Sequence, residues 1–273
     1  MSRVFFRVEF DGAPFCGWQM QAAEAESRHK PSLQATLETA LSVALRRREE
    51  RFVVHGCGRT DAGVHAEEYY CHVDLPLSTG EELGRLRQSL NAILPPEFVI
   101  TQAALMPDDA HALEDVVSKT YEYRLYLRRA KPTLLRGRVL WLPLDPAAGV
   151  FDFPNFERAV QLFQGEHDFA PFASAHGTAR TTVRSILRAE VVCEPDASAG
   201  MLVRVRFTGT GFLKQQVRTM VGTALEVAQG KRPVESVEKL LRSGGVRQEA
   251  GPCVAGEGLF LTSVRYEHKI PGL

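Results

Sequence analysis

One short stretch of the chain combines glycine with side chains that are suited to catalysis. Residues 56–66 read GCGRTDAGVHA and hold three glycines together with Arg59, Asp61 and His65. Glycine tolerates left-handed or crowded backbone conformations, so a loop with glycines on both sides can hold a side chain at a fixed point. A carboxylate can act as nucleophile, general base or ligand, and a nearby arginine can bind phosphate or keep that carboxylate ionised. Asp61 is therefore a candidate catalytic residue, although most aspartates beside glycine are turn or helix-cap residues.

A metal site is the competing hypothesis for the same region. Zinc favours histidine and cysteine ligands, and within eighteen positions the chain has His55, Cys57, His65, Cys71 and His72. Their spacing matches no standard pattern of paired ligands. In a strand, neighbours such as Cys71 and His72 point to opposite faces and do not easily share one ion. We therefore expect no metal, and we rank Cys57 low as a thiol nucleophile because no partner for it can be named.

The composition is that of an ordinary globular protein. Of the 273 residues, 44% are hydrophobic and 24% are charged, which suits one large or two closely joined α/β units. No segment approaches the roughly 20 apolar residues of a membrane span. The first residues, MSRVFFRVEF, predict a strand without a signal-peptide core, so we expect a cytoplasmic protein with no membrane contact. Five widely spaced cysteines predict free thiols rather than disulfides.

The charges balance over the whole chain but not locally. There are 33 basic and 33 acidic residues, yet residues 126–138 (YLRRAKPTLLRGR) hold no acid and five basic side chains, Arg128, Arg129, Lys131, Arg136 and Arg138. Such a run forms either a phosphate-binding patch or a solvated loop and strand end, and charge alone does not decide between them.

Strand and helix patterns alternate along the chain. Periodicity and capping signals predict helices at residues 32–48, 81–91, 156–162 and 214–229. Alternating apolar residues predict strands at 4–12, 68–75, 120–128, 186–193 and 202–209, the last two as a hairpin, and residues 52–55 are expected to run as a strand into Gly56. The predicted fold class is α/β (α+β), with a mixed, largely antiparallel sheet and helices packed on it.

The two halves of the chain resemble each other. RVEFDGAPFCGWQ (residues 7–19) aligns without a gap with RVRFTGTGFLKQQ (204–216), and TALSVA (39–44) matches TALEVA (223–228). A strand, a glycine turn and a helix that occur twice predict two similar subdomains with the site in the cleft between them. We divide the chain into residues 1–110, which carry Asp61, and residues 111–273.

Residues 58–65, GRTDAGVH, resemble the signature of the TruA family of transfer-RNA pseudouridine synthases, in which the aspartate is catalytic. Further family segments follow in the same order along nearly the whole chain. They are FDG with FxGWQ (10–19), NxxLP (91–95), PDDxHA (107–112), YxYR (121–124), VRxxVG (217–222) and EGLxL (257–261).

The resemblance implies the pseudouridine synthase fold and an enzyme that cuts the bond between C1′ and N1 of a uridine, turns the base and rejoins it through C5. Asp61 would attack C1′ or C6, or assist the cleavage, and no cofactor or metal would be needed. Arg218 would pair with Asp61, and Tyr121 would stack on the base. Arg59 would hold the flipped nucleotide's phosphate, and Leu259 would contact the substrate. The substrate would be the anticodon arm of transfer RNA at positions 38 to 40, bound by a homodimer.

The chain departs from the family pattern at two places. Leu113 and Glu114 stand where the family usually has arginine and an aromatic residue, and Lys214-Gln215-Gln216 stands where histidine or tyrosine is common. Both changes bear on RNA contacts rather than on the chemistry. Two other functions remain open from the sequence: a non-catalytic protein of the same fold that binds or folds transfer RNA, and a zinc-dependent hydrolase.

Overall fold

The computed structural model describes residues 1–20, 30–77, 79–175, 179–197, 199–242 and 245–267. The chain forms two compact units, the first made of Met1–Val117 with Leu261–Leu273 and the second of Ser118–Phe260. The boundary between the two units therefore follows residue 117, whereas the sequence-based division placed it after residue 110. The last part of the chain, from residue 261, belongs to the first unit. The division of function between two subdomains stays a prediction.

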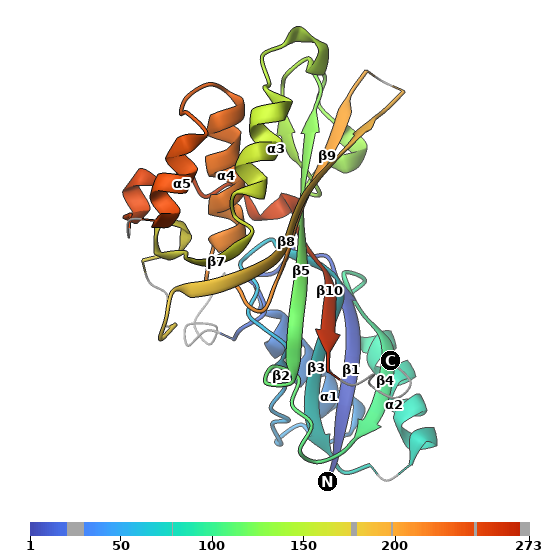
Figure 1. Cartoon of the computed structure of the whole chain (residues 1–273). Coiled ribbons are helices and arrows are strands. Elements are labelled where there is room, and N and C mark those ends of the chain that lie inside the picture. Colours follow the sequence, from blue (N-terminus) through green and yellow to red (C-terminus); the bar gives the residue numbers. More distant parts are fainter. Residues whose placement is uncertain (21–29, 78, 176–178, 198, 243–244, 268–273) are drawn as a thin grey trace. The chain divides into compact units, whose positions relative to one another are not determined.

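The first unit is an antiparallel sheet with two helices (Figure 1). Strand β1 (Ser2–Phe10) lies between β3 (His65–Leu75) and β4 (Phe98–Met106), and the short β2 (His55–Gly56) pairs with β3. The part of β10 (Leu259–Tyr266) that belongs to this unit lies beside β3, and there the Val264 N–H donates to Glu68 at 3.0 Å. Helix α2 (Gly80–Ile93) packs on β4 and contacts α1 (Leu33–Ala44).

Side-chain caps explain where the two helices begin. The Ser32 side chain accepts a hydrogen bond from the Ala35 N–H at the start of α1, and Thr79 and Glu82 form a capping box at the start of α2. Helix α1 ends at Ala44 rather than at the expected Arg48. The reason is local, because Arg46 has a left-handed φ of 56° and turns the chain away from the helix.

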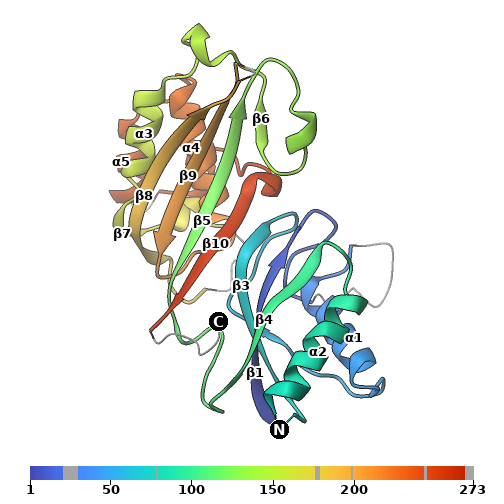
Figure 2. The same cartoon turned by 90° about the vertical axis from the view of Figure 1, so that its right-hand side faces the viewer.

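The second unit is a sheet with three helices on one side (Figure 2). Its antiparallel strands follow the order β5 (Val116–Leu127), β9 (Met201–Gly209), β8 (Val183–Pro195) and β7 (Gly165–Asp168), and β6 (Leu140–Leu142) runs parallel to β5. The helices are α3 (Phe153–Gln161), α4 (Gln216–Ala228) and α5 (Glu235–Arg242). The mixed, largely antiparallel sheet and the β8–β9 hairpin are confirmed.

A buried carboxylate lies on the sheet face away from the core of the second unit. Glu122 of β5 accepts from Arg124 at 2.7 Å, from Arg206 at 2.7 Å and from Arg204 at 3.0 Å. Burial alone would raise the pKa of Glu122, but the hydrogen bonds from these arginines outweigh burial and lower it. The charged Glu122 thus ties β5 to β9 directly beside Tyr121.

The segments matched by the internal repeat include the end of a strand and part of a helix in each unit. Residues 7–10 end β1 and residues 204–209 end β9, while TALSVA lies in α1 and TALEVA lies in α4. The sequence did not predict β4, β6, β7 or α5, and residues 52–54 form no strand.

Candidate active site

The loop that carries Asp61 is held against β3 of the first unit. The Tyr69 hydroxyl donates to the Gly58 carbonyl at 2.5 Å, and the Cys57 N–H donates to the Tyr70 carbonyl at 2.8 Å. Past the turn, the Val64 N–H donates to the backbone carbonyl of Asp61 at 3.2 Å. Within this fixed loop Asp61 is partly exposed and Arg59 is exposed.

The glycines around Asp61 serve two different purposes. Gly63 has a φ of 76°, which side chains rarely tolerate, so the expected left-handed backbone occurs there. Gly56 is needed for space instead, because a Cβ atom at this position would overlap the Tyr69 hydroxyl and lie 2.5 Å from the indole nitrogen of Trp18. Both glycines fix the path of the loop.

The turn after β1 lies directly against the Asp61 loop. A Cβ atom at Gly12 would overlap the Val64 carbonyl, and one at Gly17, where φ is 114°, would overlap the Thr60 carbonyl. The Trp18 N–H donates to that same Thr60 carbonyl at 3.3 Å. The sequence shows two glycines in FDGAPFCGW, but only the fold reveals which backbone atoms they meet.

His65 is a structural residue. Its side chain is 2% exposed, and its Nδ1 accepts from the Gly12 N–H at 3.1 Å. Asp11 Oδ1 lies 3.0 Å from the same nitrogen but also accepts from the Ala13 N–H. Both neighbours of Nδ1 belong to the turn after β1, so the buried His65 ring holds this turn against the Asp61 loop.

Tyr121 is a fixed aromatic side chain in the second unit. It is 8% exposed and lies opposite Phe207 in the β5–β9 pairing. Its ring meets that of Phe212 edge to face, with centroids 5.1 Å apart and planes at 82°. The strand pairing and the contact with Phe212 hold the Tyr121 ring in a defined orientation.

Arg218 lies in the first turn of α4, and its own side chain is anchored. Its Nε donates to the Val254 carbonyl at 2.7 Å, which orients the guanidinium. The segment that carries Val254 approaches α4 closely because Gly222 has no side chain; a Cβ atom there would overlap the Pro252 carbonyl. The sequence motif includes Gly222, but its link to Val254 appears only in the structure.

Leu259 and the Lys214-Gln215-Gln216 segment also belong to the second unit. Leu259 is 5% exposed at the start of β10. Gln216 is fully buried and accepts from the Leu213 N–H at 2.8 Å, so it packs inside the unit, whereas Lys214 is exposed. Of the three residues in this segment that depart from the family pattern, only Lys214 and the half-buried Gln215 lie at the surface.

The candidate residues thus form two groups, each positioned by its own unit. Arg59 and Asp61 belong to the first unit, and Tyr121, Arg218 and Leu259 belong to the second. The first group lies on a loop with a fixed backbone, and in the second group the side chains of Tyr121 and Arg218 are held by neighbouring residues.

Comparison with known proteins decides the family. A family model described as tRNA pseudouridine synthase matches residues 159–267. Proteins named tRNA pseudouridine synthase A are 35% identical in Citrifermentans bemidjiense (98% of this chain, 99% of the relative), 35% in Streptococcus mutans (95% and 97%) and 37% in Syntrophotalea carbinolica (97% and 97%). The chain belongs to the tRNA pseudouridine synthase A family. A solved structure, the dye-decolorizing protein from V. cholerae, aligns over 96% of this chain and 91% of its own at 9% identity and a TM-score of 0.19, which carries no structural argument.

Membership of the tRNA pseudouridine synthase A family makes the chain an isomerase that modifies transfer RNA. It decides against the two rival hypotheses, the non-catalytic RNA-binding protein and the zinc hydrolase. No helix among the described residues is long and apolar enough to cross a membrane.

The zinc hypothesis can also be judged from the geometry of this family member. In the described part of the chain, potential metal ligands gather at His55, His72 and His111, with one nitrogen of each within 4.8 Å of the others. The other residues considered from the sequence, Cys57, His65 and Cys71, are not in that group. None of the five cysteines forms a disulfide, and burial raises the pKa of the Cys71 thiol, so Cys71 is an unreactive side chain.

Hydrogen bonds at two of these histidines, His72 and His111, argue against a zinc site. The Ala112 N–H donates to Nδ1 of His72 at 3.1 Å, and the N–H groups of residues 113 and 114 donate to Nδ1 of His111 at 3.2 Å each. A neutral imidazole that accepts at Nδ1 carries its proton on Nε2, so neither nitrogen keeps a lone pair for a metal. In this family member the rings of His72 and His111 hold the turn at residues 112–114 in place.

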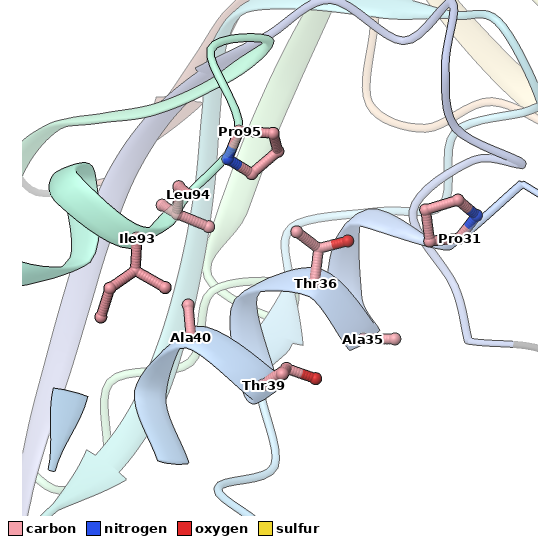
Figure 3. Close-up of a pocket in the computed structure, with 8 residues that line it drawn as sticks. All are labelled: Pro31, Ala35, Thr36, Thr39, Ala40, Ile93, Leu94 and Pro95. Carbon is pink, nitrogen blue, oxygen red and sulfur yellow. The ribbon is translucent and has the colours of Figure 1, made fainter. Parts of the chain in front are cut away.

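Two surface pockets of the first unit lie away from the candidate residues. One, of about 330 Å³, lies between α1 and the end of α2 and is lined by apolar and threonine side chains (Figure 3). The other, of about 500 Å³, lies between α2 and β4. None of the five candidate residues lines either pocket.

Proposed function

We propose that this chain converts uridine to pseudouridine at positions 38 to 40 of the transfer-RNA anticodon stem-loop, with Asp61 as the nucleophile. The observation that carries the proposal is the Asp61 loop itself. Its backbone is fixed by Gly12, Gly17 and Tyr69, and the carboxylate remains partly exposed. The relatives named tRNA pseudouridine synthase A support the reaction class.

The reaction is an internal rearrangement, which explains why no cofactor is expected. The C1′–N1 bond breaks and a C1′–C5 bond forms; C5 loses a proton and N1 gains one, so the product has the same atoms as the substrate. An attack by the Asp61 carboxylate on C1′ displaces N1 and gives a sugar ester, which the base displaces when it rejoins through C5. An attack on C6 instead gives an adduct with the base, and the carboxylate leaves C6 by elimination after C5 has bonded to C1′ and lost its proton.

The second group of residues binds and orients the substrate in this proposal. Arg218 pairs with Asp61 and keeps it ionised where little water is present, and Tyr121 stacks on the base and assists proton movement. Arg59 binds the phosphate of the flipped nucleotide, and Leu259 offers an apolar contact to the base. These roles require the two groups to meet in one cleft.

The proposal further places the enzyme in the cytoplasm as a homodimer. A dimer would sediment at about twice the chain mass of 30.3 kDa. Sedimentation at the monomer mass, at concentrations where the protein is active, would remove the dimer from the proposal.

Replacement of Asp61 by asparagine tests the catalytic assignment. The change keeps the size of the side chain but removes its nucleophilic charge, so we expect pseudouridine formation to fall by at least about a thousandfold. The measurement is a pseudouridine map of transfer RNA from cells that carry either form. Glu81→Gln is the matched control, because it makes the same chemical change on an exposed helix position. Survival of the modification with Asp61→Asn would show that the assignment is wrong.

A further inference from the structure

A loop of the second unit carries several positively charged side chains that have no role in the proposed catalytic step. Residues 128–139, called the basic loop below, join β5 to β6 and include no acid. Figure 2 shows it as the green segment beside β6. Its basic residues are Arg128, Arg129, Lys131, Arg136 and Arg138. The sequence alone did not decide whether this segment is a binding surface or a solvated loop.

The basic loop has a defined backbone. At its base, the Arg128 N–H donates to the Leu142 carbonyl at 3.1 Å, and the Trp141 indole N–H donates to the Arg128 carbonyl at 2.8 Å. Inside the loop, a single 3₁₀ turn at Thr133–Leu135 is followed by Gly137 with a φ of 75°. A loop ordered in this way has less conformational entropy to lose when it binds a partner.

The charges of the basic loop are largely available. Arg129 pairs with Asp145 at 3.1 Å, yet its side chain remains 78% exposed. Lys131 and Arg136 are exposed, and among the described side chains neither has an ion-pair partner. In a chain of zero net charge, this local excess creates a positive surface that attracts a polyanion.

An apolar side chain stands among these charges. Leu134 is 96% exposed in the turn of the basic loop. A single exposed leucine is common on protein surfaces, but one at the turn of an ordered basic loop suits contact with a nucleic acid. The apolar face of a ribose or a base can cover it while phosphates bind the basic residues nearby.

We propose that the basic loop binds the phosphate backbone of the RNA substrate outside the target nucleotide, and that Leu134 packs against a ribose or base between the bound phosphates. That the occupant is RNA rests on the proposed function. The loop then adds affinity through ion pairs that release counterions, a contribution independent of RNA sequence.

Salt-dependent binding of a transfer-RNA transcript tests this assignment. Removing the charges in Lys131→Gln/Arg136→Gln should lower affinity by about tenfold at low salt and reduce the slope of log K against log salt by about one to two. Leu134→Ala should lower affinity by about threefold to tenfold without changing the slope, because no charge is lost. Arg85→Gln, which removes an exposed charge from α2, is the matched control and should resemble the unmodified protein.

Two outcomes would overturn the proposal. If the double variant binds with the affinity and slope of Arg85→Gln, the basic loop is not an RNA-binding surface. If Leu134→Ala binds as the unmodified protein does, the apolar contact is wrong. Pseudouridine formation by the same unmodified preparation reports the proposed function separately. A protein that shows the slope change but forms no pseudouridine contradicts the catalytic proposal and leaves the basic loop supported.

Discussion

At the scale of single residues, Asp61 and Arg218 are positioned by different means. Asp61 depends on its neighbours, because Gly12 and Gly17 let another backbone segment pack against its loop. Arg218 depends on its own side chain, whose Nε is bonded to the Val254 carbonyl at 2.7 Å. The position of the Asp61 carboxylate should therefore be sensitive to changes at Gly12 and Gly17, which alter the backbone spacing. The position of Arg218 should be sensitive to a change of the side chain itself, because a lysine there would lack the planar guanidinium.

His72 illustrates a residue that is buried for structure rather than chemistry. It is 2% exposed, and its Nδ1 accepts from Ala112 in the turn before β5. Burial, followed by the charges of His111, Arg3 and His55, lowers the pKa of His72 to about 4. Protonation would remove the acceptor that this N–H requires.

The lowered pKa predicts a loss of stability in acid. The unfolded chain takes up a proton on this ring near pH 6.5, whereas the folded protein resists it until about pH 4. The stability that the neutral His72 ring contributes is thus complete above pH 6.5 and is lost as the pH falls toward 4. We expect the free energy of unfolding to decrease by about 3 kcal/mol over this range. Urea denaturation across this range measures it.

His72→Gln is the matched variant, because an amide oxygen can accept the same N–H without titrating. Between pH 6.5 and 4 the free energy of unfolding should fall less in the variant than in the unmodified protein. Subtracting one decrease from the other removes the contribution of all other titrating groups, because these are shared by both proteins. Equal pH dependence in both proteins would show that His72 contributes nothing to it.

The sequence proposes candidate reactive residues, but it does not show which residues support them. Asp61, Tyr121 and Arg218 are named through the family resemblance, and their joint role stays a prediction. The partners that hold them, such as Gly12 against Val64, are distant in the chain and have ordinary residue types. Which backbone atoms meet is a property of the fold, and no spacing rule predicts it.

At the scale of elements, the contact between α4 and the segment at residues 250–254 governs the geometry of Arg218. The Gly251 N–H donates to the Thr223 hydroxyl at 2.9 Å, and Gly222 lies against the Pro252 carbonyl. This close approach brings the Val254 carbonyl to Arg218. Helix α4 and residues 250–254 therefore form one closely packed unit.

Gly222→Ala should disrupt the packing of α4 against residues 250–254. The added Cβ would overlap the Pro252 carbonyl, and a backbone atom cannot move aside as a flexible side chain can. We expect the free energy of unfolding to fall by about 1–3 kcal/mol and turnover to fall as Val254 shifts from Arg218. Thermal denaturation and pseudouridine formation measure the two effects.

The matched control is Gly84→Ala in α2, where a Cβ would meet nothing within 4 Å. Alanine favours helices over glycine, so this variant should be more stable by about 0.5–1 kcal/mol. The packing argument fails if Gly222→Ala proves as stable as Gly84→Ala.

Elements with a clear start signal or a clear alternating run were predicted, whereas β4, β6, β7 and α5 were not. Ser32 correctly indicated the start of α1, and the β8–β9 hairpin followed from two alternating runs. Strand β6 has three residues and β7 has four, too few for a period to be recognised. Their pairing partners, not their own residues, define them as strands.

At the scale of the whole molecule, the chain has no net charge to attract RNA. With 33 basic and 33 acidic residues, affinity must come from where the charges lie. Within the second unit, acids bind arginines on one sheet face around Glu122, whereas the basic loop keeps most of its charge exposed. The neutral composition is therefore compatible with a local RNA-binding surface.

The complete enzyme should work without a bound metal. The proposed reaction conserves all atoms, and the hydrogen bonds at Nδ1 of His72 and His111 leave no lone pair for zinc. We expect protein treated with a chelator, and then returned to a magnesium buffer so that the transfer RNA stays folded, to retain its rate of pseudouridine formation within about twofold. Elemental analysis of the purified protein should find less than stoichiometric zinc. A rate that disappears with chelation and returns with added zinc would restore the metal hypothesis and would require the Nδ1 hydrogen bonds to break on binding.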